Sequence, residues 1–265
     1  MGVPDLEHDD GIVTVVLDGH PQSAVDLADP TRLVFEYVQH LALAVDALAP
    51  AGRLRTTHVG GAGLTLARWL QHTRPGSPQV VLEPDTALTE TVRRELPLPR
   101  GHRIRVRPQR GEDGVAGLAD ASADLVVLDA YAEGRVPAAL VTQAWLRDVA
   151  RVLVPGGLLL ANLADDRGLR WALRVTAGAQ RTVGHVALLG LHEVLKGRRF
   201  GNVVLVASTE PLRLFDLRRA CASAPLPTGV LAGPELERRT AGARPFTAED
   251  TQPSPEPPHR DGWRR

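Results

Sequence analysis

The sequence predicts an α/β protein built on a mostly parallel, seven-stranded sheet, with helices on both faces and a β-hairpin in front of it. Short apolar runs alternate with amphipathic segments along most of the chain, which is the pattern of successive strand and helix units. Some of these runs, such as Leu125-Val126-Val127-Leu128, are apolar at every position, which is typical of strands buried on both faces of a parallel sheet. A chain of 265 residues is long enough to bury one such core and to carry small additions.

The first expected elements precede this sheet. Ile12 to Leu17 is β-branched and apolar, Asp18-Gly19 indicates a turn, and Ser23-Ala24-Val25 forms the returning arm of a hairpin. Asp29-Pro30 is a typical helix start, because proline is favoured at the first helical position. We expect this helix to end at Pro50-Ala51-Gly52.

The sheet and its helices follow by the same criteria. Strands are expected at 54–59, 79–83, 104–107, 125–129, 158–163, 185–189 and 203–208, and helices at 64–73, 85–95, 137–153 and 167–182. Only about a dozen residues with little helical periodicity join the last two strands, so the last strand is expected to pair antiparallel. The chain then divides into a hairpin region 1–30, an α/β domain 31–208, an extension 209–246 and a tail 247–265, whose prolines among polar residues indicate disorder.

A glycine-rich turn follows the first strand of the expected sheet. The segment His58-Val59-Gly60-Gly61-Ala62-Gly63-Leu64 leads into an amphipathic stretch, and about twenty positions later Val80-Val81-Leu82 ends in Glu83. In parallel α/β sheets this order builds a nucleoside pocket, because the glycines let the backbone approach the ligand and the acid accepts hydrogen bonds from ribose hydroxyls. The pattern predicts a ribose-bearing ligand, bound by Gly60, Gly61, Gly63 and Glu83.

The glycine spacing narrows the kind of nucleoside. A dinucleotide fingerprint starting at Gly61 would need a third glycine where Leu66 stands, and the chain has no P-loop motif. The common remaining ligand is a sulfonium nucleoside, S-adenosylmethionine or its decarboxylated form. The alternative is that the glycines form only a tight turn and that Glu83 is a solvated strand end.

Acidic residues follow several of the expected strands, at the edge where open parallel sheets bind ligands. Asp129 ends a buried strand, and a partly desolvated carboxylate there could orient an incoming amine and take its proton; a turn or a helix cap is the alternative. Asp113 either faces an adenine amino group or lies in a surface turn, and Tyr131 either forms a pocket wall or only packs. Asp165 and Asp166 precede a helix and are expected to be caps.

Composition indicates the setting in which the protein works. Basic and acidic residues number 31 each, so the net charge gives no indication of nucleic acid or an anionic membrane as a partner. Lys196 is the only lysine, which we attribute to coding bias, and the single Cys221 fits a reducing compartment. No apolar stretch is long enough to span a bilayer and the acidic start is unlike a signal peptide, so we expect a cytoplasmic protein. No His, Cys and Asp residues have metal-ligand spacing, and His58 is expected to be a core residue.

A series of motifs, in this order, resembles the spermidine synthase family of polyamine aminopropyltransferases. They are Leu17-Asp18-Gly19-x-x-Gln22, Glu36 with His40-Leu41, Gly60-Gly61-Ala62-Gly63, Glu83-Pro84-Asp85, Asp113-Gly114 and Asp124-Leu125-Val126-Val127-Leu128-Asp129. The resemblance covers roughly residues 10 to 208 and implies a Rossmann-like, class I methyltransferase fold. It also implies that Gln22 and Glu83 contact the nucleoside, Asp113 the adenine and Asp129 the attacking amine.

Two positions depart from the family pattern. Ala132 stands where the family has a second acid, and Val34-Phe35 stands where it has a Tyr-Gln pair. The leading hypothesis is aminopropyl transfer from decarboxylated S-adenosylmethionine to a small-molecule amine, with Asp129 as the orienting acid or base and no metal. Methyl transfer from S-adenosylmethionine is one alternative, and a non-catalytic nucleoside-binding or dimerisation module is another. The chain could also act as a homodimer.

Overall fold

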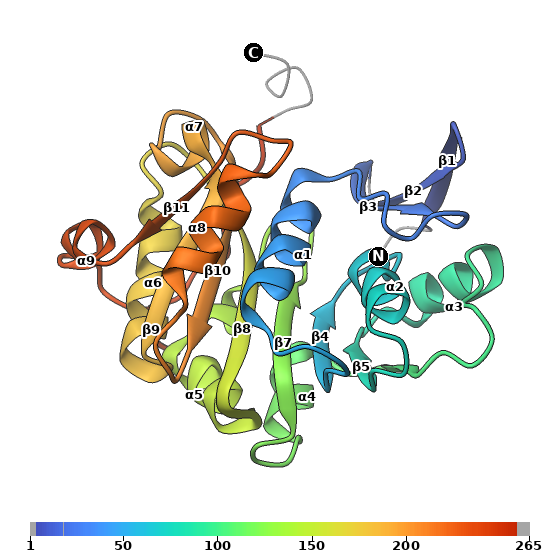
Figure 1. Ribbon diagram of the computed structural model, residues 1–265, viewed down its shortest axis with the longest axis horizontal. Helices are drawn as coiled ribbons and strands as arrows, with labels where there is room; N and C mark the ends of the chain where they lie inside the picture. Colours follow the sequence, from blue (N-terminus) through green and yellow to red (C-terminus); the bar gives the residue numbers. More distant parts are fainter. Residues whose placement is uncertain (1–3, 18, 259–265) are drawn as a thin grey trace.

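The structure is built on one large open β-sheet covered by helices, and the N-terminal residues form a separate three-stranded sheet (Figure 1). The computed structural model describes residues 4–17 and 19–258, so Asp18 of the expected turn and residues 259–265 of the expected tail lie outside the described residues. The strands are β1 (Asp5–Asp9), β2 (Ile12–Leu17), β3 (His20–Asp26), β4 (Thr56–Gly60), β5 (Gln79–Leu82), β6 (Ile104–Arg107), β7 (Ala123–Asp129), β8 (Leu153–Asp165), β9 (His185–Leu191), β10 (Gly201–Ser208) and β11 (Thr228–Ala232).

Helices connect most of these strands. They are α1 (Glu36–Leu48), α2 (Thr65–Thr73), α3 (Thr86–Glu95), α4 (Gly111–Ala116), α5 (Gln143–Val152), α6 (Arg170–Thr182), α7 (His192–Leu195), α8 (Leu214–Ala222) and α9 (Pro234–Thr240), with a 3₁₀ turn at Ala138–Val141. Among the described residues, no helix is both long enough and apolar enough to cross a membrane.

The strand order of the large sheet is β11-β9-β10-β8-β7-β4-β5-β6. The five strands from β8 to β6 are parallel to one another, whereas β10 is antiparallel to both β8 and β9. The expected antiparallel last strand is therefore confirmed. The chain order reverses between β4 and β7, and ligands of such sheets bind beyond the carboxyl ends of the strands at this switch point.

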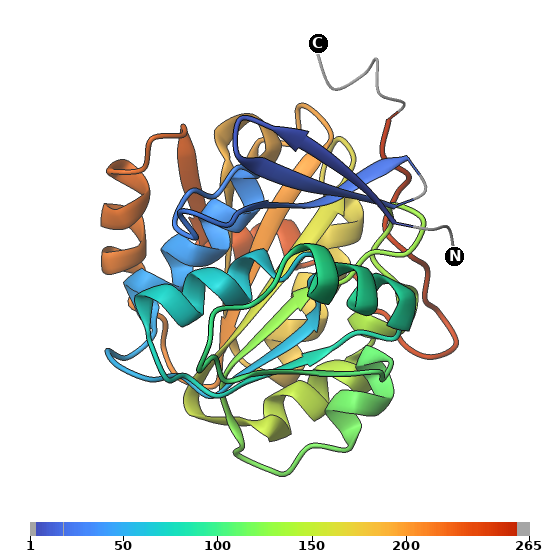
Figure 2. The same cartoon turned by 90° about the vertical axis from the view of Figure 1, so that its right-hand side faces the viewer.

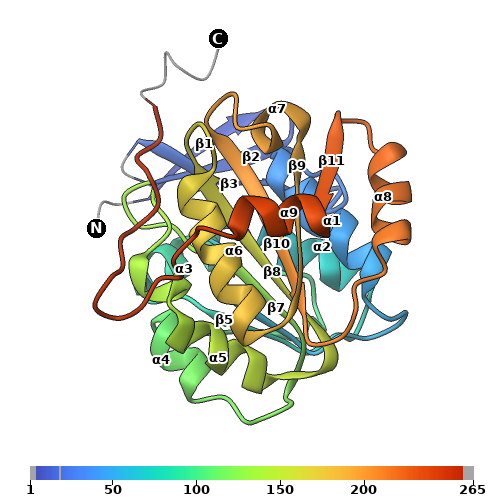
Figure 3. The ribbon, with the colours of Figure 1, turned by 90° about the vertical axis from the view of Figure 1, so that its left-hand side faces the viewer.

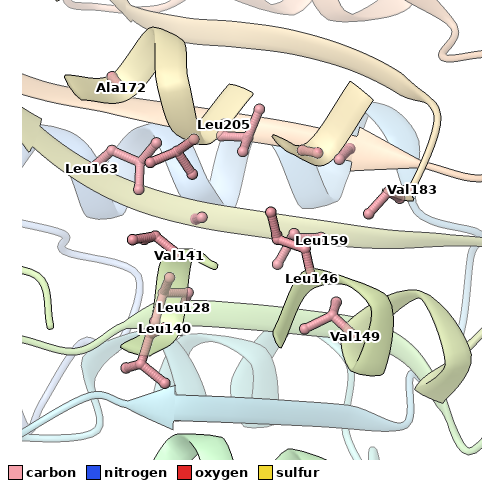
Figure 4. Close-up of a cluster of buried hydrophobic side chains, with 14 of the residues drawn as sticks. Leu128, Leu140, Val141, Leu146, Val149, Leu159, Leu163, Ala172, Val183 and Leu205 are labelled. Atoms are coloured by element: carbon pink, nitrogen blue, oxygen red, sulfur yellow. The ribbon is translucent and has the colours of Figure 1, made fainter. Parts of the chain in front are cut away.

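Helices cover both faces of the large sheet, as the apolar strands predict. On one face, α1, α2 and α8 pack against residues that alternate along the strands, such as Leu125, Val127 and Leu160. On the other face, α5 and α6 pack against Leu128 and Leu159, a cluster drawn in Figure 4. Figure 3 shows α4, α5, α6 and α9 in front of this second face.

The N-terminal region is a three-stranded antiparallel sheet rather than a two-stranded hairpin. Strand β1 pairs with β2, and it escapes detection in the sequence because its residues are mostly charged and exposed. Val13, Val15 and Val25 pack on α2 and α3, so this sheet lies over one end of the large sheet, as Figure 2 shows.

The helix expected to start at Asp29-Pro30 instead begins at Glu36, so this prediction is wrong. Asp29 begins a turn: its carbonyl accepts the N–H of Arg32 at 3.0 Å, and its Oδ1 accepts the backbone N–H and the hydroxyl of Thr31 at 2.9 Å and 2.6 Å. The helix expected at 137–153 is likewise divided: Thr142 accepts the N–H of Trp145 and so starts α5 after the 3₁₀ turn.

Two C-terminal features also differ from expectation. An eighth strand, β11, pairs antiparallel with β9 at the sheet edge, where the sequence predicted seven strands. Residues 247–258, expected to be disordered, instead pack on the domain: Ser254 is fully buried and its hydroxyl accepts the N–H of Val136 at 2.9 Å. Trp171 of α6 donates its indole N–H to the carbonyl of Gln252 at 3.0 Å, and Figure 3 shows this segment passing α6. Hydrogen bonds between side chains and the backbone therefore hold a segment whose composition alone indicates disorder.

Candidate functional site

The glycine turn lies at the carboxyl end of β4, beside the switch point of the sheet. Gly60 and Gly61 have φ of 78° and 125°, in the left-handed region that favours glycine. Ala62 and Leu64 also have positive φ, at 34° and 63°, which costs free energy for residues with a side chain. The turn is therefore held in a strained backbone conformation, a common property of ligand-binding loops.

The three glycines of the predicted site have different surroundings. A Cβ on Gly60 would lie 2.5 Å from the carbonyl oxygen of Asp129, and a Cβ on Gly63 would lie 2.9 Å from the hydroxyl of Ser23. These two glycines allow β7 and β3 to approach the turn. A Cβ on Gly61 would meet no atom within 4 Å, so of the three it is Gly61 whose backbone faces open space.

The N-terminal sheet is fastened to the glycine turn. The hydroxyls of Ser23 and Thr65 are 2.6 Å apart, and Thr65 also donates to the carbonyl of Ala24 at 3.1 Å. Gln22 is the neighbour of Ser23, and its backbone carbonyl accepts the hydroxyl of Tyr37 at 3.4 Å. The structure therefore brings Gln22 to the same edge as the glycines.

Asp129 ends β7 directly beside Gly60, its partner in the parallel pairing of β4 and β7. Burial raises the pKa of its carboxyl to about 6, and a hydrogen bond from Asn162 opposes part of that rise. A carboxyl with a pKa near neutrality can accept a proton and release it again. Asp129 thus has the environment of a general base.

Two asparagines that were not predicted from the sequence are linked to this carboxylate, one directly and the other through the first. Asn162 of β8 donates from Nδ2 to Oδ1 of Asp129 at 2.9 Å. Asn202 of β10 donates from Nδ2 to Oδ1 of Asn162 at 2.8 Å and to the hydroxyl of Tyr131 at 3.1 Å. Tyr131 is therefore part of the same hydrogen-bonded group, and its place in a pocket wall stays a prediction.

Composition contains a signal for this group. The chain has only two tyrosines and only two asparagines. Tyr37 and Asp129 line one small cavity, and the charge of Asp129 raises the pKa of both Tyr37 and Tyr131, in addition to the effect of burial. Two residue types that this chain otherwise does without are thus gathered around one carboxylate.

Glu83 follows β5, and β5 and β7 both pair parallel with β4. Glu83 and Asp129 therefore lie at the same edge of the sheet, as expected. Oε1 of Glu83 accepts the N–H of Asp85 at 2.9 Å, and burial raises the pKa of the carboxyl. No hydrogen bond from another described residue to Oε2 is found, so this oxygen is available to a ligand.

The remaining predicted residues separate into two groups. Asp113 is exposed in the first turn of α4, a helix the sequence analysis did not predict, and it follows β6 at the same edge. Leu169 is at the N-cap position of α6, but Asp165 caps the first turn of the helix from a distance, because its Oδ2 accepts the N–H of Ala172 at 2.8 Å. Asp166 accepts the N–H of Arg167 at 2.6 Å, outside the helix, and is not a cap. His58 is a core residue, as predicted: it is 5% exposed and its Nε2 lies 2.8 Å from Oε1 of Gln79.

Two cavities adjoin these residues. The one lined by Gly60, Gly61, Tyr37 and Asp129 has a volume of about 10 Å³, the space of one water molecule. The other, of about 250 Å³, lies between α2, α3 and β6 and is lined by Glu83 among mostly apolar side chains. Among residues 4–17 and 19–258, no group of three or more His, Cys, Asp and Glu side chains is placed to hold a metal ion.

Comparisons with known proteins agree with the architecture. No protein-family model matches the chain, and no curated protein matches its sequence. A probable spermidine synthase from Corynebacterium glutamicum has a similar structure, with a TM-score of 0.85, 28% identity and 92% of each chain covered.

More distant structures share the fold. The spermidine synthase of Thermotoga maritima has a TM-score of 0.58 and 18% identity, over 93% of this chain and 78% of that one. Human methyltransferase-like protein 13, solved in complex with SAH, has a TM-score of 0.58 and 20% identity, over 81% of this chain and 96% of that one. The resemblance to spermidine synthases that the sequence motifs indicated is thus confirmed in structure, and the fold is the Rossmann-like fold of class I methyltransferases.

Proposed function

We propose that the protein is a transferase that uses a sulfonium nucleoside, and that it transfers the aminopropyl group of decarboxylated S-adenosylmethionine to an amine. The observation that carries this proposal is the placement of Asp129. A mostly buried carboxyl with a pKa of about 6 lies beside the glycine turn, at the same sheet edge as Glu83. The similarity to the probable spermidine synthase, over 92% of both chains, supports the same conclusion.

The proposed chemistry needs alignment and removal of one proton. The nitrogen of the acceptor attacks the aminopropyl carbon bonded to sulfur, the carbon–sulfur bond breaks, and its electron pair returns to sulfur to give a neutral thioether. An amine reaches the site mostly protonated, so a base must take a proton before the nitrogen can attack. Asp129 is the proposed base, and the enzyme otherwise contributes orientation and exclusion of water.

The proposal assigns the nucleoside to the edge between the glycine turn and Glu83. Glu83 would accept hydrogen bonds from the ribose hydroxyls through Oε2, and Gly61 would let the backbone approach the ligand. Gln22 and Tyr131 would also contact the nucleoside, and Asp113 would reach the adenine. Because the cavity beside Asp129 is only about 10 Å³, binding requires side chains around it, such as Tyr37, to move apart.

Calorimetry with both sulfonium nucleosides tests the proposal. We expect decarboxylated S-adenosylmethionine to bind more tightly than S-adenosylmethionine, and Glu83→Gln to weaken binding. Glu90→Gln is a matched control, because Glu90 is an exposed carboxylate on α3, outside both cavities. Tight binding of S-adenosylmethionine alone would reject aminopropyl transfer, since its carboxylate would then need a partner in the site.

Methyl transfer is the second candidate. Ala132 favours it, because this residue replaces the second acid that a polyamine site would use to hold a dication. Both reactions place a nucleophile in line with a carbon bonded to sulfur, so the acceptor distinguishes them. A non-catalytic nucleoside-binding module is the third candidate. Turnover of any acceptor that is lost in a folded Asp129→Asn variant would exclude it.

A further inference from the structure

The carboxylate of Asp129 is the last member of a chain of hydrogen-bonded side chains that spans three strands. Asn202, Asn162 and Asp129 come from β10, β8 and β7, which are adjacent in the sheet. Asn162 is fully buried, and it interrupts an apolar run in which Leu158 and Leu160 face α1. Because side chains alternate along a strand, Asn162 faces α1 as well, at the height of Asp129.

The direction of every hydrogen bond in this chain is determined by its members. A carboxylate can only accept, so Asn162 must turn Nδ2 toward Asp129 and Oδ1 toward Asn202. Asn202 meets that oxygen with Nδ2, and the same Nδ2 donates to the hydroxyl of Tyr131. Both N–H groups of Asn202 are therefore used, which keeps Asn162 from rotating its amide by 180°.

The titratable groups near Asp129 do not stabilise its charged form. Tyr37 of α1 and His58 of β4 line the same small cavity, and Tyr131 lies in the loop that follows β7. Burial raises the pKa of both tyrosines and lowers that of His58 to about 4, so all three are neutral near pH 7. The hydrogen bond from Asn162 is the one interaction that favours the charged form of Asp129 against its burial.

We infer that Asn162 and Asn202 are positioning residues for Asp129: Asn202 fixes the amide of Asn162, and Asn162 holds the carboxylate ionised and aims its second oxygen at the cavity. Neither asparagine needs to touch the substrate to do this. The inference rests on the proposed function for its catalytic meaning, because it assigns these residues to the group proposed as the base. The hydrogen-bonded chain itself can be tested without any substrate.

The test is the titration of Asp129 in protein labelled with ¹³C at the aspartate carboxyl, with the Asp129→Asn variant identifying the signal. Asn162→Leu removes the donor at nearly constant volume, and Asn202→Leu leaves Asn162 free to turn its oxygen toward Asp129. We expect the pKa of Asp129 to rise by about one to two pH units in Asn162→Leu, and by a smaller amount in Asn202→Leu. Thr176→Val, a buried change within α6, is the control and should leave the titration unchanged.

The two variants also separate the possible failures. An unchanged titration in both would overturn the inference, and a rise in Asn162→Leu alone would overturn the part given to Asn202. Asn202 is only partly buried at the start of β10, so Asn202→Leu should fold even if Asn162→Leu does not. In that case an unchanged titration of Asp129 in Asn202→Leu would by itself overturn the inference. If transfer is observed, the acidic limb of its pH profile should move with the titration. If no nucleoside binds while the titration shifts as expected, the proposed function fails and the hydrogen-bonded chain remains.

Discussion

Replacing Asp129 by asparagine should stabilise the protein at neutral pH, although it removes the proposed base. The side chain keeps its shape, and an amide oxygen at this position can still accept the N–H of Asn162, which lies 2.9 Å from Oδ1 of the carboxylate. The variant removes the cost of holding a charge in a mostly buried place. Burial raises the pKa of the carboxyl from 3.8 to about 6. This rise in pKa corresponds to a cost of about 3 kcal/mol for the ionised form.

The sign of the effect depends on pH. Well below pH 3.8 the carboxyl is protonated in both the folded and the unfolded chain, so the wild type and the variant should be nearly equal in stability. Between 3.8 and about 6 the folded chain binds the proton more tightly, so the stability of the wild type falls as the pH rises. Above about pH 7 the full cost is present. Partial contact with solvent reduces it, and we expect the variant to be more stable by about 2–3 kcal/mol, roughly 4–10 °C in Tm.

Urea denaturation of both proteins between pH 4.5 and 8.5 measures this difference. Glu7→Gln is the control, because Glu7 is an exposed carboxylate on β1. The stability gain of Asp129→Asn should grow with pH and level off, while transfer activity is lost at every pH. A difference that does not change with pH, or a variant that is less stable at pH 8, would refute the conclusion that Asp129 is ionised at a cost.

Three further predictions concern other parts of the structure. Glu83→Ala should lower nucleoside affinity about ten- to a thousandfold in calorimetry, through loss of charge-assisted hydrogen bonds, and should hardly change the Tm without ligand. Gly60→Ala should cost about 2–6 kcal/mol in chemical denaturation, because its Cβ would lie 2.5 Å from a backbone oxygen, whereas Gly61→Ala should cost only the 1–3 kcal/mol or so of its backbone strain. Ser254→Ala should cost about 1–3 kcal/mol in the same assay, because the N–H of buried Val136 loses its acceptor; no change would contradict the packing of this segment.

The sequence was sufficient to place Glu83 and Asp129 at one edge of the sheet. Glu83 and Asp129 both end apolar runs, and the carboxyl ends of parallel strands meet at one edge whatever the register, so no tertiary contact had to be known. The hydrogen-bonded group around Asp129 could not be found in this way. Asn162 and Asn202 are 40 positions apart, and their contact depends on β10 lying antiparallel beside β8.

The elements that differ from the sequence-based predictions do so for local reasons. Strand β1 is charged and exposed, and β11 pairs on one side only, so neither has the apolar pattern that identifies a buried strand. Aspartate is a residue type that is common at helix N-caps, but the carboxylate of Asp29 accepts hydrogen bonds from Thr31 in a turn, and the helix starts later. The segment 247–258 is rich in proline and polar residues, and its order comes from partners more than a hundred positions earlier, such as Val136.

The glycines contribute less to the case for a nucleoside than their pattern suggests. Gly60 and Gly63 are required by the close approach of β7 and β3, and they would be required in a protein that binds nothing. Gly61 alone of the three has open space beside it, and Glu83 has a carboxylate oxygen without a hydrogen bond from the described residues. Burial raises the pKa of the carboxyls of both Glu83 and Asp129. At a pH where such a carboxyl is ionised, its burial lowers the stability of the folded chain. Glu83 and Asp129 are thus costly to keep at one edge of the sheet, and hydrogen bonds donated by the proposed nucleoside and acceptor would offset that cost.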